Sequence, residues 1–123
     1  MRDNIVKDKS FDFAIRIVKL YQYLNYNKKE FVLSKQLLRS GTSIGAMIRE
    51  AEHAESKNDF IHKFAIAQKE ANEVVYWLEL LKATDYLNEK EFENIYNDAI
   101  TFLKLITSIL KTSKNQLVSK EIR

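Results

Sequence analysis

The spacing of apolar residues constrains this chain more than any other feature. Four segments place mostly apolar side chains at steps of four, three, four and three residues. Such a 3.5-residue repeat keeps one seam of an α-helix facing its neighbours. The pattern predicts four amphipathic helices with these seams: Phe13, Ile17, Leu20, Leu24; Leu33, Leu37, Ser40, Ile44, Met47, Ala51, Ala54; Phe60, Phe64, Ala67, Ala71, Val74, Leu78, Leu81; and Phe92, Tyr96, Ala99, Leu103, Ile106, Leu110.

Capping signals set the expected helix boundaries. Ser10, Ser56 and Asn88 are candidate N-caps, and the last two are followed three residues later by Asp59 and Glu91. Residues 1–9 are expected as an extended lead-in and 113–123 as a basic tail that frays. Short connections make successive helices antiparallel, which predicts one all-α domain over 1–123, an up-down-up-down four-helix bundle. The expected helices span about 11–27, 30–55, 57–83 and 89–112.

Composition removes several classes of protein. The 123 residues include no cysteine, no proline and two glycines, which argues against disulfide frameworks, thiolate sites and glycine-rich phosphate loops. No apolar run approaches the roughly 18 residues of a membrane span, and the first residues lack the apolar region of a signal peptide. We therefore expect a cytoplasmic protein without a membrane partner.

The sequence offers little for catalysis. Residues 50–53 have the Glu-x-x-His spacing of di-metal bundles, and Asp59 with His62 imitates it. However, capping explains Asp59, while Glu50 and His53 flank the seam rather than occupy it. No Gly-x-Ser-x-Gly elbow is present. We expect no catalytic residue, metal or cofactor, and hence no enzyme; a metal-dependent bundle enzyme would require bound metal.

Charge is distributed unevenly along the chain. Residues 1–49 carry a net charge of +6, residues 50–98 carry −7 and residues 99–123 carry +4, which gives the overall +3. This asymmetry suggests one face for an anionic partner and another for self-association. The alternative is that the oppositely charged segments pair within the chain.

Basic residues at helical spacing form the candidate nucleic-acid contacts. A multi-point supply of cations is what phosphate binding requires, because affinity grows with the counterions released. Cations near helix C-termini also complement the helix dipole, so the pattern alone is not specific. The candidates are Arg16, Lys19, Lys35, Arg39 and Arg49, supplemented by the basic tail; Arg39 is alternatively an interface ion-pair residue.

The first and last predicted helices carry more apolar residues than one seam uses. Exposed apolar stripes of that extent mark interfaces, which predicts a homo-oligomer. The alternative is a lone bundle that tolerates surface aromatics. The expected interface residues are Phe11, Ile15 and Val18 on the first helix and Ile95, Phe102 and Ile109 on the last.

Two glycines interrupt the second predicted helix. Each costs about 0.5–1 kcal/mol relative to alanine in a helix interior. Gly41 and Gly45 lie four apart, so they place a small-residue strip on one helix face. We interpret the strip as a site of close helix packing; the alternative is a backbone surface that accepts a ligand.

A set of short motifs along the chain is distinctive in combination. These motifs are Gln36-Leu37-Leu38-Arg39-Ser40-Gly41-Thr42-Ser43-Ile44-Gly45-Ala46, Glu50-Ala51, Ser10-Phe11-x-Phe13-Ala14, Ser56-Lys57-x-Asp59-Phe60, Lys69-Glu70-Ala71 and Tyr76-Trp77-Leu78-x-Leu80-Leu81. Through them the chain resembles the small four-helix-bundle family encoded by intervening sequences within bacterial 23S ribosomal RNA genes, also called the S23 ribosomal protein family. One departure is Met47, where the family commonly has asparagine, and this weakens any polar role there.

The resemblance implies an assembly and a context rather than an activity. It implies a ring-like homopentamer with bundles around a central channel, exposed basic surface and a ribosomal-RNA setting. A related fold serves diversity-generating retroelements as an accessory protein that binds RNA and a reverse transcriptase. The leading hypothesis is therefore a non-enzymatic, homo-oligomeric protein that binds ribosomal or other structured RNA. The alternative is a protein-interaction scaffold or accessory subunit without direct nucleic-acid binding.

Overall fold

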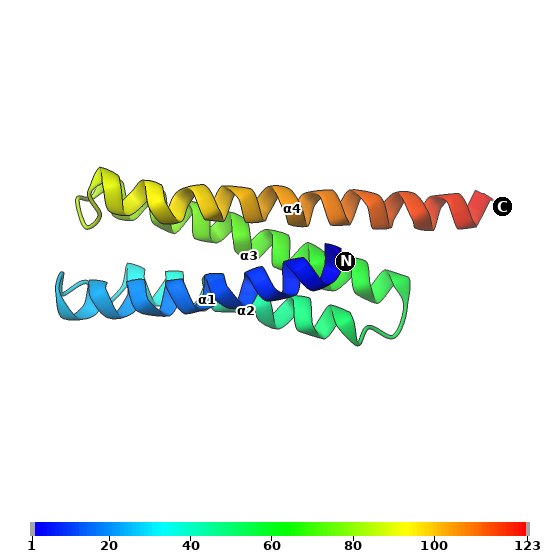
Figure 1. Ribbon diagram of the computed structural model, residues 1–123, viewed down its shortest axis with the longest axis horizontal. Coiled ribbons are helices and arrows are strands. Elements are labelled where there is room, and N and C mark those ends of the chain that lie inside the picture. Colours follow the sequence, from blue (N-terminus) through cyan, green and yellow to red (C-terminus); the bar gives the residue numbers. More distant parts are fainter. Residues whose placement is uncertain (1, 123) are drawn as a thin grey trace.

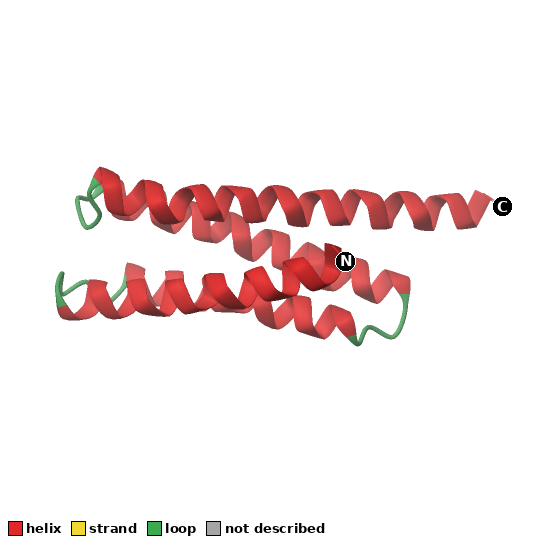
Figure 2. Ribbon diagram, viewed as in Figure 1, coloured by secondary structure: helices red, strands yellow, loops and turns green. Residues whose placement is uncertain are grey.

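Four α-helices make up the fold. The computed structural model describes the backbone of residues 2–122 and the side chains of residues 5–119, and this part of the chain contains no strand. Successive helices run antiparallel and are joined by short loops (Figures 1 and 2). The predicted all-α, four-helix class is confirmed, with α1 at Arg2–Tyr26, α2 at Leu33–Glu52, α3 at Lys57–Ala83 and α4 at Glu89–Ile122.

The predicted seams form most of the core. Two predicted caps are also confirmed, since the backbone N–H of Asp59 donates to Ser56 Oγ at 3.0 Å. Asn88 and Glu91 exchange two such bonds, at 2.8 and 2.9 Å. The seam residues that are 1% exposed or less are Ile17, Leu24, Leu37, Ser40, Ile44, Phe64, Ala67, Val74, Leu78, Leu81 and Ile106.

Helix α1 begins at Arg2, so the expected extended lead-in is wrong over residues 2–9, as is the Ser10 cap, while residue 1 lies outside the described residues. Val6 and Ser10 are 0% and 1% exposed and continue the four-three steps of the seam toward the N-terminus. Ser10 sits inside the helix, where its hydroxyl donates to the Lys7 carbonyl oxygen at 2.7 Å. A serine that bonds to the preceding turn is compatible with a helix interior.

Helix α2 is shorter than expected at both ends. The Glu30 carboxylate accepts hydrogen bonds from the backbone N–H groups of Val32, Leu33 and Ser34 at 2.7–3.0 Å, so the helix begins after it. At the other end, Ser56 must be extended (φ −155°, ψ 169°) to cap α3, so α2 ends at Glu52.

Helix α4 continues ten residues beyond the expected end at residue 112. Ser113 is buried, and Gln116 accepts a hydrogen bond from Lys57 Nζ at 2.9 Å. The seam therefore continues through Ser113 and Leu117, and the expected fraying of residues 113–122 is wrong. The backbone of Arg123 lies outside the described residues, as do the side chains of Lys120 and Arg123.

The contacts between neighbouring helices are unequal. Helix α2 packs against α1 and α3, and α3 packs against α4, but α1 and α4 approach each other over a much smaller area. Figure 1 shows α4 extending past the N-terminal end of α1. Helices α1 and α4 are therefore each covered mainly by one neighbour, α2 and α3 respectively. None of the described helices combines the length and apolarity needed to cross a membrane.

Candidate nucleic-acid interface

Arg16 does not project freely from α1. Its guanidinium forms an ion pair with Asp98 and donates to Asn94 Oδ1 at 2.9 Å, both on α4. Its charge is therefore opposed by an acidic residue of the same chain. The interaction also connects α1 to α4, which otherwise contact each other little.

Arg39 is engaged in the same way with α3. Its guanidinium donates to Glu73 Oε1 at 3.0 Å and to Glu70 Oε2 at 3.4 Å. Glu70 is 7% exposed, so this arginine compensates a buried carboxylate. The ion pair that the sequence suggested for Arg39 lies within one chain.

The remaining three predicted contacts are exposed, and the described residues provide no ion pair for them. Lys19 lies on α1, while Lys35 and Arg49 lie near opposite ends of α2. The Arg49 guanidinium is 5.2 Å from the ring centroid of Phe11, a cation–π contact that leaves its N–H donors available. Lys111 and Lys114 on α4 are also exposed.

The five predicted cations do not form one patch. Arg16 and Lys19 line a hollow of about 290 Å³ with residues of α4, including Glu91 and Asn94. Lys35 and Arg49 are fourteen residues apart on one helix, about 21 Å along its axis. The alternative prediction, that the oppositely charged segments pair within the chain, is confirmed in part. The ion pairs are Lys7–Glu52, Arg16–Asp98 and Arg39 with Glu70 and Glu73.

The predicted apolar stripes behave differently on the two helices. On α1, Phe11, Ile15 and Val18 are 52%, 41% and 37% exposed. On α4, Ile95, Phe102 and Ile109 are at most 5% exposed, so the expectation that they form an outward stripe is wrong. Helix α4 uses its wide apolar surface within the chain, as shown by the Phe102 ring centroid lying 5.7 Å from that of Phe13.

The glycine strip on α2 is a packing feature at Gly41. A Cβ atom there would lie 2.7 Å from Ile17 Cγ2, so the close approach of α1 requires glycine. At Gly45 the nearest atom, Ser10 Oγ, would lie 3.4 Å away, an ordinary contact. The structural interpretation is confirmed for Gly41.

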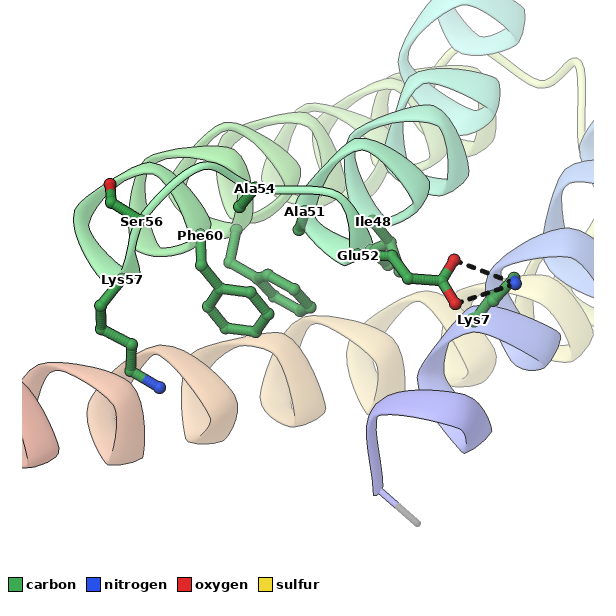
Figure 3. A pocket seen from close by; sticks show the side chains of 9 residues that line it. Lys7, Ile48, Ala51, Glu52, Ala54, Ser56, Lys57 and Phe60 are labelled. Carbon is green, nitrogen blue, oxygen red and sulfur yellow. Dashed lines mark hydrogen bonds and ion pairs between the residues drawn. The ribbon is translucent and has the colours of Figure 1, made fainter.

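A hollow of about 450 Å³ lies where the α2–α3 turn meets α1 (Figure 3). Its floor includes the stacked rings of Phe60 and Phe64, whose centroids are 4.7 Å apart. Lys7 Nζ lies 3.0 Å from Glu52 Oε2, and this hydrogen-bonded lysine lowers the pKa of the Glu52 carboxyl. Lys57 binds Gln116 on α4, so the two lysines here act as links between elements.

Two tyrosines whose pKa values are raised also form hydrogen bonds between helices. The Tyr96 hydroxyl donates to Glu79 Oε2 at 2.8 Å, and this bond raises the Tyr96 pKa. A hydrogen bond to Glu91 likewise raises the pKa of Tyr23.

The Glu-x-x-His spacing at residues 50–53 does not form a metal site with the other described residues. Glu50 Oε1 lies 3.1 Å from Lys63 Nζ and forms an ion pair with it. Within residues 5–119, no group of three or more histidine, aspartate or glutamate side chains is placed so that it could hold a metal ion.

Sequence reasoning missed an aromatic slot between the end of α1 and the start of α2. It measures about 490 Å³ and is lined in part by Tyr21, Tyr26, Phe31 and Lys29. Most of its lining residues lie on the last turns of α1, and Lys29 and Phe31 come from the connection to α2. Four aromatic residues and two lysines within residues 21–31 are the sequence signal that could have revealed it.

Comparison with known proteins places these features in context. The model of a family described as "23S rRNA-intervening sequence protein" matches residues 2–108. A crystal structure at 1.70 Å of a protein of unknown function from the S23 ribosomal protein family of Bacteroides thetaiotaomicron VPI-5482 is 60% identical, with a TM-score of 0.88. The match covers 90% of this chain and 99% of that one. No curated protein is similar enough to count as a relative.

Proposed function

We propose that this chain, which belongs to the 23S rRNA-intervening sequence protein family, is a non-enzymatic protein that self-associates through α1 and binds structured RNA. The observation that carries the proposal is that Lys19, Lys35 and Arg49 are exposed without an ion pair among the described residues, while α1 carries an exposed apolar stripe whose Phe11 contacts Arg49. The stripe supplies the subunit contact and the cations supply the phosphate contacts.

Self-association follows from the position of the stripe. Phe11, Ile15 and Val18 recur at helical spacing on α1, whose main neighbour within the chain is α2, and all three stay exposed. A contiguous apolar surface of this kind on a small protein marks an interaction site. A ring-like homo-oligomer, a pentamer in our proposal, buries the stripe and repeats the cations of each chain around the assembly.

RNA binding follows from the cations that internal pairing leaves available. Three exposed cations on one chain provide modest affinity, but an oligomer multiplies them. Contacts to phosphates position RNA without reading its sequence. We therefore propose recognition of RNA by shape, as is usual for structured RNA.

A salt titration tests the phosphate contacts. The probe is a hairpin fragment of bacterial 23S ribosomal RNA, with duplex DNA as competitor, and affinity is measured by fluorescence anisotropy. We expect log affinity to fall linearly with log salt concentration for the unaltered protein. The triple variant Lys19→Gln, Lys35→Gln and Arg49→Gln should flatten this slope by about three for each chain in contact.

A second triple variant is the matched control. Lys7→Gln, Lys63→Gln and Lys82→Gln remove the same charge at positions that are ion-paired in the structure. This variant should retain the slope. Equal slopes for both variants and the unaltered protein would refute the phosphate assignment. Absence of RNA binding at low salt by an intact oligomer would refute RNA association and favour a protein-interaction scaffold.

A further inference from the structure

The α1–α2 connection gathers the most exposed large apolar side chains of the described residues. Tyr26, Phe31 and Val32 are 74%, 57% and 71% exposed, all within seven residues. Burial of apolar surface normally removes such groups from water, so their clustering indicates a contact surface. Tyr26 and Phe31 line the aromatic slot, whose volume of about 490 Å³ lies within the range of sites that hold small organic groups.

The slot combines flat apolar walls with polar edges. Tyr21, Tyr26 and Phe31 supply aromatic rings, and Gln22 and Asn25 supply amides. The Asn25 amide nitrogen donates to the Tyr21 carbonyl oxygen at 2.8 Å and to Ser34 Oγ at 3.1 Å. These bonds hold the Asn25 side chain in place and leave its amide oxygen as the acceptor it offers to a ligand.

Lys29 occupies a backbone position that favours glycine. Its φ is 56°, in the left-handed region. The chain turns there at the end of α1, and the next N–H, that of Glu30, donates back to the Leu24 carbonyl oxygen at 2.9 Å. Glycine is the usual residue at such a helix end, because other L-residues are disfavoured there. A lysine that tolerates this backbone and lines the slot indicates a use for its side chain.

The charge around the slot is positive. Lys29 lines the slot, and Lys28 and Lys35 lie nearby in the sequence, while the neighbouring acid, Glu30, is 6% exposed and accepts hydrogen bonds from three backbone N–H groups. The slot lining includes no acidic side chain among the described residues. Aromatic rings beside unpaired cations are the combination with which proteins hold single-stranded nucleic acid.

We propose that the slot binds an unpaired RNA base, stacked on Tyr26 and Phe31, with Lys29 on an adjoining phosphate. This inference rests on the proposed RNA association and adds a site for unpaired nucleotides to the phosphate contacts on the helices. Loops or bulges of a structured RNA would occupy it, since bases there are free to leave the helical stack.

Two RNAs test the inference. One is a hairpin with a twelve-base-pair stem and an eight-nucleotide unpaired loop, and the other is the same stem as a blunt duplex. Phe31→Ala should weaken binding of the loop RNA by about five- to 150-fold, the range for loss of one base–aromatic stack. Binding of the duplex should change less than about twofold. Tyr76→Ala, at an exposed aromatic on α3, is the control and should change neither.

Side-chain shape separates base stacking from a general apolar contact. Phe31→Trp keeps a flat ring and should bind the loop RNA at least as tightly as the unaltered protein. Phe31→Leu keeps an apolar side chain without a ring and should bind as weakly as Phe31→Ala. If Phe31→Leu binds like the unaltered protein, the stacking proposal is wrong.

Adjacent lysines provide a charge-matched pair. Lys29 lines the slot, whereas Lys28 Nζ lies 5.9 Å from the ring centroid of Tyr23, which faces α4 through Glu91. Lys29→Gln should weaken loop binding several-fold more than Lys28→Gln. Lys29→Gly should do the same while the protein unfolds at an equal or higher temperature, because glycine suits this backbone.

The outcomes distinguish this inference from the proposed function. If both RNAs bind equally and Phe31→Ala changes neither, the slot does not hold a base, although RNA association stands. If neither RNA binds, the proposed function is wrong and the inference falls with it.

Discussion

At the scale of single residues, the structure shows why particular side chains occupy positions that look unfavourable. Gly41 interrupts a helix because Ile17 of α1 occupies the space of a side chain. Glu30 is a buried carboxylate because three backbone N–H groups at the start of α2 need an acceptor. In both cases a locally unfavourable residue permits a stabilising interaction: close packing of α1 on α2 at Gly41, and hydrogen bonds to the start of α2 at Glu30.

The glycine pair gives a direct test. Gly41→Ala should destabilise the protein by about 1–2 kcal/mol, because overpacking against Ile17 outweighs the gain in helix propensity. Gly45→Ala should be neutral or stabilise by up to about 1 kcal/mol, since its new methyl group makes an ordinary contact. Urea denaturation of both variants measures the difference. Equal stabilities would show that α1 and α2 pack less closely than in the structure.

The Glu30 carboxylate makes part of the stability depend on pH. Burial opposes its ionisation, but the bonds from the Leu33, Ser34 and Val32 N–H groups outweigh burial and lower its pKa below about 4.5. A group with a lowered native pKa stabilises the fold above its unfolded pKa, and this contribution is lost as pH falls through the native value.

Glu30→Gln should therefore cost about 1 kcal/mol at neutral pH and less at about pH 3. Denaturation curves at both pH values measure the effect. The exposed Glu55→Gln is the control and should show a small difference at both. A cost for Glu30→Gln that stays constant down to about pH 3 would contradict the assignment.

At the scale of the elements, the sequence predicts helix bounds correctly where the capping residue and the first apolar seam residue indicate the same starting point. Helix α3 has the predicted bounds because Ser56 caps the point where its apolar seam begins. The start of α1 was missed because Ser10 resembles a cap, although Val6 and Ser10 extend the seam by two steps. A serine is ambiguous between cap and helix interior until its burial is known.

Val6 tests the extended α1. It is 0% exposed, so Val6→Ala should cost about 1–3 kcal/mol through lost burial and a residual cavity. Ile5→Ala at the neighbouring residue, 50% exposed, should cost less than about 0.5 kcal/mol. If the two variants are equally stable on thermal denaturation, residues 2–9 do not pack as a helix against the core.

At the scale of the whole molecule, the candidate interface was less predictable than the fold. Periodicity indicates which residues are apolar and on which face, but not which neighbour covers them. Ile95 and Phe102 were therefore assigned outward although α4 faces two helices. Similarly, the partners of Arg16 and Arg39 lie far along the chain, on α4 and α3, so only the folded structure shows that these arginines are paired.

The remaining exposed stripe should control assembly. Ile15→Glu places a charge at the centre of the stripe, which an apolar contact between subunits cannot accommodate. We expect the oligomer to dissociate while the helical content is retained, as followed by sedimentation velocity and circular dichroism. Tyr76→Glu, at an exposed position on α3, should leave the assembly intact. An oligomer that survives Ile15→Glu places the subunit contact elsewhere.

Native mass spectrometry of the unaltered protein mixed with the 23S ribosomal RNA hairpin tests the central claim most directly, because it reports subunit number and bound RNA together. The account predicts a homo-oligomer that carries RNA at low ionic strength and releases it as salt is raised. A protein that remains a single chain and carries no RNA at low ionic strength would contradict it.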